Sequence, residues 1–322
     1  MNVKTFQALV VREDTAGKFT RRIETRSVAE LPPDDVLIRV QYSSLNYKDA
    51  LSASGNKGVT RRYPHTPGID AAGRVAETGE EVLVTGYELG TNRAGGFGQY
   101  IRVAQECVVP WPAKLTLRES MIFGTAGFTA AQSIQRLREH GITQGEVLVT
   151  GATGGVGCTA VAILSHLGYR VIAVTGKPET TEWLKSIGAS EVVGREAVID
   201  ATGKPLLKGR WDAVVETAGG PVLAAVIRST NYRGIVTCCG NVGGAELPLS
   251  VYPFILRGVT LAGIDSAQCP MPQRRNIWEK LAGDWKPSVL EKLARECSLD
   301  QLSGEINRTL AGQQCGRIVV RL

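Results

Sequence analysis

The sequence predicts an α/β protein with two domains, a partly open β-barrel and a doubly wound parallel sheet, on the strength of three observations. Short alternating or apolar runs, separated by Gly and Pro, fill roughly the first 120 residues. From about residue 125, strand-like apolar runs alternate with helical segments. With 322 residues, of which 43% are hydrophobic, the chain can bury a sizeable core in about two domains.

The N-terminal part is expected to be β-rich. Its strand-like runs cover 7–11, 36–42, 81–85 and 99–109. Short strands punctuated by turn residues are typical of a barrel.

The middle part is predicted to alternate between strands and helices. The strand EVLVTG leads into an Ala-rich helix that starts at about 156 and runs through Leu167. The segments YRVIAVTG, TTEWLKSIGA, WDAVVETAGG, RGIVTCCG and GVTLAGI continue the alternation. Nearly continuous apolar strands of this kind indicate a parallel sheet covered by helices on both faces.

The tail after about 265 contains a Pro-containing loop, two predicted helices at 273–284 and 287–296, and the strand-like ending GRIVVRL. We expect it to return to the first domain. The predicted boundaries are therefore 1–124 for the first part of the β-barrel domain, 125–264 for the parallel-sheet domain and 265–322 for the return.

Composition narrows the class of protein. The seven cysteines form no CxxC pair, which favours reduced thiols. No apolar run is long enough to span a bilayer, and no signal-peptide pattern opens the chain, so we expect a cytoplasmic protein without a membrane partner. The net charge of +6 is spread along the chain, and no basic stretch supports a nucleic-acid partner.

The segment GATGGVG at 151–157 carries the strongest local signal, because it follows a strand and opens a helix. Glycines here let the backbone approach a pyrophosphate at the helix N-terminus, and Gly157 lets the helix sit close to the sheet. Ala152 replaces the first glycine of the usual GxGxxG, and an ordinary Gly-rich turn is the alternative. We predict that Thr153, Gly154, Gly155 and Val156 bind a dinucleotide.

The end of the second strand favours NADPH over NADH. An NAD site usually has Asp or Glu there, whereas this chain has Thr175, Gly176 and Lys177. A hydroxyl, an open backbone and a cation suit a 2′-phosphate. A solvated lysine in a turn is the alternative for Lys177.

Several motifs resemble the acrylyl-CoA reductase (NADPH) group, in the quinone oxidoreductase branch of the medium-chain dehydrogenase/reductases. They are SSLNYKDAL at 43–51, TPGIDAAGRV at 66–75, GTAGFTA at 124–130, GATGGVG, and YPFILRGVTLAGIDS at 252–266. The resemblance implies a GroES-like catalytic domain, an inserted Rossmann domain, and reduction of acryloyl-CoA to propanoyl-CoA.

The resemblance also implies that zinc is not used. In zinc-dependent relatives a Cys ligand matches Asn46, and a GHE motif matches Gly68, Ile69 and Asp70. An amide is a weak donor and an isoleucine has none, so the usual tetrahedral site cannot form. Without a Lewis acid, reduction of an activated alkene is easier than alcohol oxidation, because the thioester already withdraws electrons: hydride enters at Cβ and a proton reaches Cα.

Asn46 and Tyr47 are the catalytic candidates, because the resemblance places their segment beside the nicotinamide. Asn46 can donate to a carbonyl oxygen, and Tyr47 can contact the cofactor or donate the proton. A buried structural tyrosine and a turn-capping asparagine are the alternatives. Asp49 and Asp70 lie in the same motifs, where we expect structural duty first.

Further cofactor contacts are predicted at the ends of strands and at the join between domains. Thr125, Gly127 and Phe128 lie at the join, although Phe128 fits a core position equally well. Cys239, Gly240 and Asn241 follow one strand, and Ile264 and Asp265 follow the next. Arg317 can reach a phosphate or form a surface ion pair.

Three hypotheses about the function remain. The first is NADPH-dependent acryloyl-CoA reduction, and the second is quinone or general enone reduction. The third, a non-catalytic nucleotide-sensing or nucleic-acid-binding protein, has no supporting motif. The strand GVTLAGI would be an open sheet edge, so we expect a homodimer in which a partner covers it.

Overall fold

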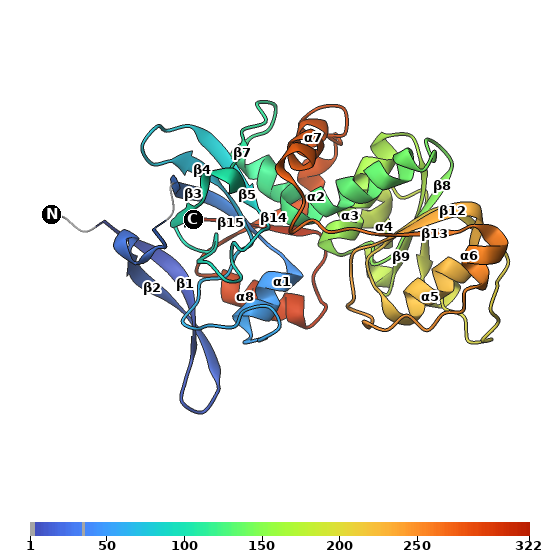
Figure 1. Ribbon diagram of the computed structural model, residues 1–322, viewed down its shortest axis with the longest axis horizontal. Coiled ribbons are helices and arrows are strands. Elements are labelled where there is room, and N and C mark those ends of the chain that lie inside the picture. Colours follow the sequence, from blue (N-terminus) through green and yellow to red (C-terminus); the bar gives the residue numbers. More distant parts are fainter. Residues whose placement is uncertain (1–3, 34–35) are drawn as a thin grey trace. The chain divides into compact units, whose positions relative to one another are not determined.

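The computed structural model describes residues 4–33 and 36–322 and divides into two compact units (Figure 1). Unit 1 comprises 1–125, 266–283 and 294–322, and unit 2 comprises 126–265 and 284–293. Residues 1–3 and 34–35, which the predicted first domain includes, lie outside the described residues.

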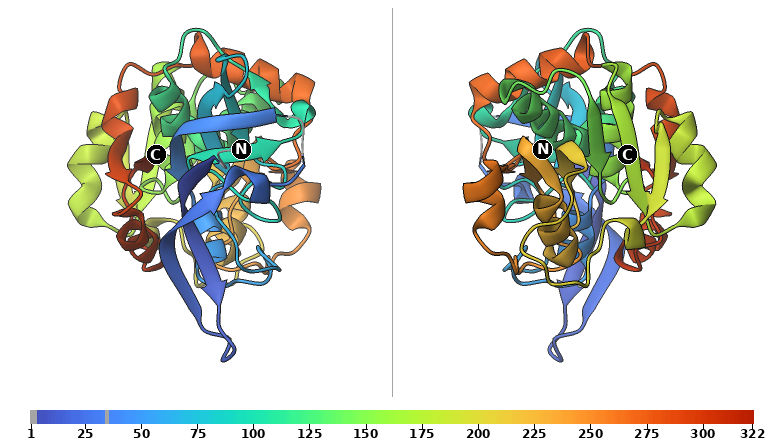
Figure 2. Two further views of the ribbon diagram at one scale, coloured as in Figure 1. Left: turned by 90° about the vertical axis from the view of Figure 1, so that its left-hand side faces the viewer. Right: turned by 90° about the vertical axis from the view of Figure 1, so that its right-hand side faces the viewer.

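Unit 1 is built on a seven-stranded sheet in the order β14-β15-β3-β4-β5-β7, with β6 also paired to β3. The hairpin β1–β2, dark blue in Figure 2, extends from it. Apolar side chains such as Leu9, Leu45 and Ile318 form its core. The strands are β1 Thr5–Glu13, β2 Phe19–Ser27, β3 Val36–Leu45, β4 Asp70–Val75, β5 Glu81–Thr85, β6 Tyr100–Val103, β7 Val109–Pro110, β14 Ala294–Ser298 and β15 Arg317–Arg321.

The helices of unit 1 are α1 Tyr47–Ala53, α7 Met271–Ala282 and α8 Leu302–Leu310. A longer helix, α2 Leu117–Glu139, runs from unit 1 into unit 2 and is kinked at Gly124, whose φ is +50°. Single 3-10 turns cover Val28–Glu30, Gln105–Cys107, Pro178–Thr180, Arg195–Ala197 and Leu290–Leu293.

Unit 2 contains a six-stranded parallel sheet in the order β10-β9-β8-β11-β12-β13, with helices on both faces (Figures 1 and 2). This confirms the parallel sheet that the apolar runs predict. The strands are β8 Glu146–Val149, β9 Arg170–Thr175, β10 Glu191–Gly194, β11 Trp211–Glu216, β12 Thr230–Cys238 and β13 Thr260–Gly263; the helices are α3 Gly155–His166, α4 Thr181–Ser186, α5 Gly220–Arg228 and α6 Tyr252–Arg257.

The tail differs from the prediction at 287–296. This segment is a 3-10 turn followed by β14, which pairs in parallel with β15 from Ala294↔Arg317 to Ser298↔Arg321. Sheet pairing therefore overrides the local helical preference. Segment 284–293 also belongs to unit 2, where the carbonyl of Asp284 bonds His166 and that of Lys292 bonds Trp183.

Across the part of the chain that the structure describes, we find no helix that combines the length and apolar character needed to cross a bilayer.

Candidate active site

The glycine-rich segment 151–157, which we call the phosphate loop after its predicted role, brings backbone segments close together. It connects β8 to α3, whose N-cap is Gly154. A Cβ on Gly157 would lie 2.3 Å from the Gly151 carbonyl oxygen, so only glycine fits where the helix meets the loop. Thr153 is buried, and Gly154, Gly155 and Val156 are half-buried at the first turn of this helix, which directs free N–H groups outward.

A cation that sequence reasoning missed lies beside the end of β9. Gly194 pairs with Thr175, so the residue after β10 neighbours the residue after β9. A Cβ on Gly176 would lie 2.7 Å from Arg195 Nε, and therefore the exposed guanidinium lies across the Gly176 backbone. Lys177 follows directly, with its backbone N–H bonded to Thr175 Oγ1 at 3.0 Å. The signal in the sequence is an arginine directly after the apolar run EVVG.

Glu216 is a second residue that the sequence did not single out. Its carboxylate is fully buried at the end of β11 and accepts bonds from Thr150 Oγ1 at 3.1 Å and from the N–H groups of Ala218 and Gly219 at 2.7 and 2.9 Å. Burial raises the pKa of this carboxyl group. Glu216 thereby ties the start of the phosphate loop to the loop after β11.

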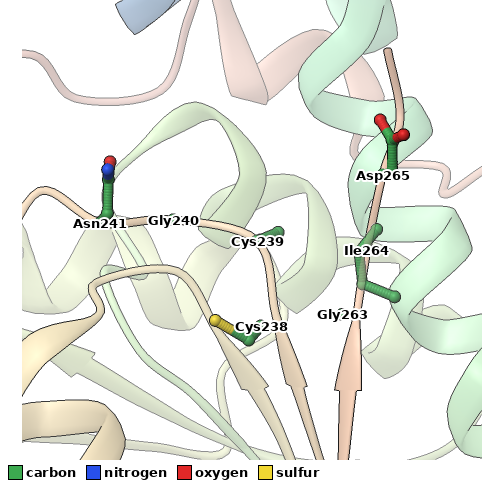
Figure 3. A pocket seen from close by; sticks show the side chains of 7 residues that line it. All are labelled: Cys238, Cys239, Gly240, Asn241, Gly263, Ile264 and Asp265. Atoms are coloured by element: carbon green, nitrogen blue, oxygen red, sulfur yellow. The ribbon is translucent and has the colours of Figure 1, made fainter. Parts of the chain in front are cut away.

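A pocket of about 660 Å³ opens at the carboxyl ends of β12 and β13 (Figure 3). The two strand-end clusters predicted as cofactor neighbours lie together at this sheet edge, because the carboxyl ends of parallel strands meet there. Gly240 is required there, since a Cβ would lie 2.0 Å from the Thr217 carbonyl oxygen. The lining residues are Cys238, Cys239, Gly240, Asn241, Gly263, Ile264 and Asp265.

The two adjacent cysteines of this pocket are held as thiols. Burial, followed by the nearby Glu216 carboxylate, raises the pKa of Cys239 to about 12 and also raises that of Cys238. The Cys239 thiol donates to the Glu216 carbonyl at 3.4 Å. Because the thiolate is the reactive form, these cysteines are poor nucleophiles.

In unit 1, Tyr47 begins α1 and Asn46 is its N-cap. Tyr47 is 40% exposed, and within the described residues nothing bonds its hydroxyl. The Asn46 amide is instead engaged by the protein: Nδ2 donates to Asp70 Oδ2 at 2.7 Å and Asp49 Oδ2 at 3.2 Å, while Oδ1 accepts from Arg317 at 3.2 Å. In this conformation Asn46 has no amide hydrogen left for a substrate carbonyl, unlike the predicted donor role.

Asp70 is the centre of a buried network. It accepts Ser44 Oγ at 2.6 Å, the Thr125 N–H at 2.9 Å and Thr125 Oγ1 at 2.5 Å, in addition to the Asn46 amide. Gly124 approaches so closely that a Cβ would lie 2.6 Å from Asp70 Oδ2. The kink in α2 therefore brings the Thr125 N–H onto this carboxylate.

Asp49 joins the same network from the first turn of α1. Its carboxylate accepts the Asn46 N–H at 2.8 Å and the Ile69 N–H at 2.8 Å, which is the structural duty expected for it. Complete burial, with the charge of Asp70 second, raises the pKa of Asp49 to about 7.

Arg317 lies inside unit 1, with 2% of its surface exposed. The guanidinium donates to the Ile122 carbonyl at 2.9 Å, to Ser44 Oγ at 2.8 Å and to Asn46 Oδ1. These contacts agree neither with a surface ion pair nor with an open phosphate ligand. Phe128 is fully buried, which favours its core interpretation.

Two family models match the chain. The alcohol dehydrogenase GroES-like domain matches residues 32–113, and the zinc-binding dehydrogenase model matches residues 155–283. The putative quinone oxidoreductase YhfP of Bacillus subtilis is 46% identical over 98% of this chain and 99% of that protein. The chain belongs to the medium-chain dehydrogenase/reductase superfamily.

Other members of this superfamily are similar over nearly the full length. The acrylyl-CoA reductase AcuI of Ruegeria pomeroyi is 42% identical over 98% of both chains. The crystal structure of Bacillus subtilis yhfP with NAD bound has a TM-score of 0.96, at 45% identity over 99% of this chain and 100% of that one. That of the Salmonella enterica yhdH oxidoreductase in complex with NADP has a TM-score of 0.95, at 41% identity over 98% and 99%. We therefore assign this chain to the oxidoreductases.

The residues at the superfamily's zinc position do not fit zinc. The Asn46 amide is bonded to two carboxylates, and Ile69 has no donor atom. Among residues 4–33 and 36–322, no group of three or more His, Cys, Asp and Glu side chains could hold a metal ion. We therefore derive no catalytic step through zinc.

Proposed function

We propose that this enzyme uses NADPH to reduce the activated carbon–carbon double bond of acryloyl-CoA, giving propanoyl-CoA. The observation that carries the proposal is the 42% identity to an acrylyl-CoA reductase over 98% of the chain. The Asn46 and Ile69 positions support it, because they favour a reaction that needs no Lewis acid. A cytoplasmic location is part of the proposal.

The charges at the ends of β9 and β10 support NADPH as the cofactor. Two similar oxidoreductases have been solved with NADP or NADPH, and a third has been solved with NAD. Arg195 and Lys177 offer two cations to a 2′-phosphate, and no carboxylate occupies the strand end at 175–177. Bound NADPH would supply the hydride for Cβ.

The residues of this chain would orient the cofactor and the substrate and would supply the proton for Cα. Thr153, Gly154, Gly155 and Val156 would hold the pyrophosphate, and Cys239, Gly240 and Ile264 would line the nicotinamide pocket. Tyr47 is our candidate to contact the cofactor and to protonate Cα, because its hydroxyl is accessible. For Asn46, Thr125 and Arg317 we propose a positioning role through the Asp70 network, in place of direct contact with substrate or cofactor.

Quinone or enone reduction is the second candidate, favoured by the 46% identity to a putative quinone oxidoreductase. NADPH consumption should be measured with acryloyl-CoA, crotonyl-CoA, a simple quinone and no acceptor, each with and without a chelator. We expect chelator-insensitive turnover of acryloyl-CoA. Quinone turnover with negligible thioester turnover would favour the second candidate.

The variant Tyr47→Phe separates the roles of that residue in the same assay. If its hydroxyl delivers the proton, we expect kcat to fall by about a hundredfold with little change in the KM for NADPH. Retained turnover would exclude the hydroxyl as an essential acid.

We also propose a homodimer formed through β13 and α6. β13 ends the sheet of unit 2, so one edge of its backbone is unpaired within the described chain. Apolar side chains on and before α6 are exposed, with Val251 at 62%, Ile255 at 67% and Leu256 at 58%. Pairing of β13 with a second copy would cover both features.

A further inference from the structure

Unit 1 has three exposed cations on α1 and in the segment that follows it. Lys48 follows Tyr47 on α1, and Arg61 and Arg62 lie between α1 and β4. Within residues 4–33 and 36–322, no carboxylate pairs with any of the three. Lys57 of the same segment differs, because it pairs with Glu13.

Hydrogen bonds fix the arginine pair against α1. Ser52 Oγ bonds Thr60 Oγ1 at 2.7 Å, and the Tyr63 hydroxyl donates to the Ser52 carbonyl at 2.7 Å. The residues on either side of Arg61 and Arg62 are therefore both bonded to Ser52. In Figure 1 the chain turns back past α1 after this helix.

Lys48 lies on the same face of α1 as this attachment point, because residues four apart on a helix are neighbours. Ser52 and Thr60 are completely buried, so the anchor is rigid while the three cations remain exposed. The only carboxylate of segment 46–66 is Asp49, which is buried in the Asp70 network. The segment thus presents positive charge without compensation.

We propose that Lys48, Arg61 and Arg62 bind the phosphate groups of the coenzyme A moiety of the substrate, an inference that rests on the proposed function. A guanidinium group can donate two parallel hydrogen bonds to the oxygens of one phosphate, and a nearby ammonium group adds a positive charge. A quinone carries no such charge, so these residues select a CoA thioester. The pantetheine arm separates the phosphates from the acyl group, so the phosphate site would be distinct from the site of reduction.

The test is a triple variant, Lys48→Gln, Arg61→Gln and Arg62→Gln, compared with a control that loses three exposed cations elsewhere in unit 1, Lys18→Gln, Arg22→Gln and Arg39→Gln. Both are assayed with acryloyl-CoA and with the phosphate-free acryloyl-N-acetylcysteamine. We expect the KM for acryloyl-CoA to rise about tenfold or more in the first variant only. Its KM for the phosphate-free thioester should change less than twofold. An equal rise for both thioesters, or in both variants, overturns the proposal.

Calorimetric titration with free CoA separates this proposal from the assigned reaction, and the KM for NADPH checks that both variants fold. Should the wild-type protein fail to reduce acryloyl-CoA, CoA affinity that weakens only in the first variant still supports the phosphate site. Absence of CoA binding to the wild-type protein overturns the site, whatever the acceptor.

Discussion

At the scale of the residue, the amide of Asn46 shows how one side chain can be fully engaged by its neighbours. Its nitrogen faces two carboxylates, and its oxygen faces a guanidinium. This arrangement fixes the orientation of the amide and the start of α1. The backbone at Tyr47, the next residue, is therefore held in place while its side chain stays exposed.

Asp49 should make stability depend on pH. The folded protein holds its proton up to about pH 7, whereas a carboxyl group with the ordinary pKa of 3.8 in the unfolded chain releases it earlier. Between these values the folded state binds more protons, so the Asp49 contribution to stability falls as pH rises, by at most about 1.4 kcal/mol per pH unit.

The variant Asp49→Asn should therefore lose stability less steeply than wild type between pH 5 and 7, as measured by urea unfolding. Asp14→Asn, at an exposed carboxylate, is the control. If wild type and Asp49→Asn show equal slopes, Asp49 does not hold the proton.

Arg195 should decide cofactor choice. Replacing it by Gln removes one cation from the proposed 2′-phosphate site, so the KM for NADPH should rise about tenfold while that for NADH changes little. Lys208→Gln removes an exposed cation of the same unit and serves as control. Equal changes for both nucleotides would assign Arg195 another role.

Sequence reasoning found the local signals at this scale and missed those that depend on pairing. GATGGVG and the strand ends around Cys239 and Ile264 are visible because each lies beside its own strand. Arg195 was missed because its proximity to Gly176 depends on the pairing of β9 with β10. The burial of Arg317 depends likewise on contacts with residues far away in the chain.

At the scale of the element, two glycines should respond oppositely to the same change. In Gly157→Ala the new Cβ would meet the backbone of the phosphate loop, and we expect a loss of about 1–3 kcal/mol and a KM for NADPH raised at least about tenfold. Gly304, within α8, has open space around it, so Gly304→Ala should gain about 0.5–1 kcal/mol. Thermal unfolding and NADPH kinetics measure both. If Gly157→Ala changes neither the stability nor the KM for NADPH, the loop and the helix can move apart without a loss of free energy.

The elements that the sequence predicted best are those with continuous apolar runs. Strands β8, β9, β11, β12 and β13 match the apolar runs that predicted them, because strands covered on both faces carry nearly continuous apolar residues. The half-exposed edge strand β10 was not predicted. The helix predicted at 287–296 was wrong. Glu, Lys, Leu and Ala in this segment favour a helix locally, but pairing with β15 makes residues Ala294–Ser298 a strand.

At the scale of the whole molecule, the proposed dimer can be measured as mass in solution. One chain has a mass of 34.5 kDa, so light scattering should give twice this mass for the protein in solution. Ile255→Glu with Leu256→Glu should shift it to the monomer, because two buried charges would be unpaired in the interface. Ile199→Glu, at another exposed apolar residue of unit 2, should leave the mass unchanged. A wild-type monomer would contradict the proposal.

The position of β15 in the sheet has a consequence for synthesis of the chain. Arg317–Arg321 lies between β14 and β3, so an interior strand of the sheet of unit 1 is synthesised long after its neighbour β3. The sheet of unit 2 is complete in the chain by Gly263 and can fold while translation continues. Until β15 has been synthesised, the Tyr42–Leu45 part of β3 lacks one of its partner strands. This unpaired edge is a place where the nascent chain can pair with other chains.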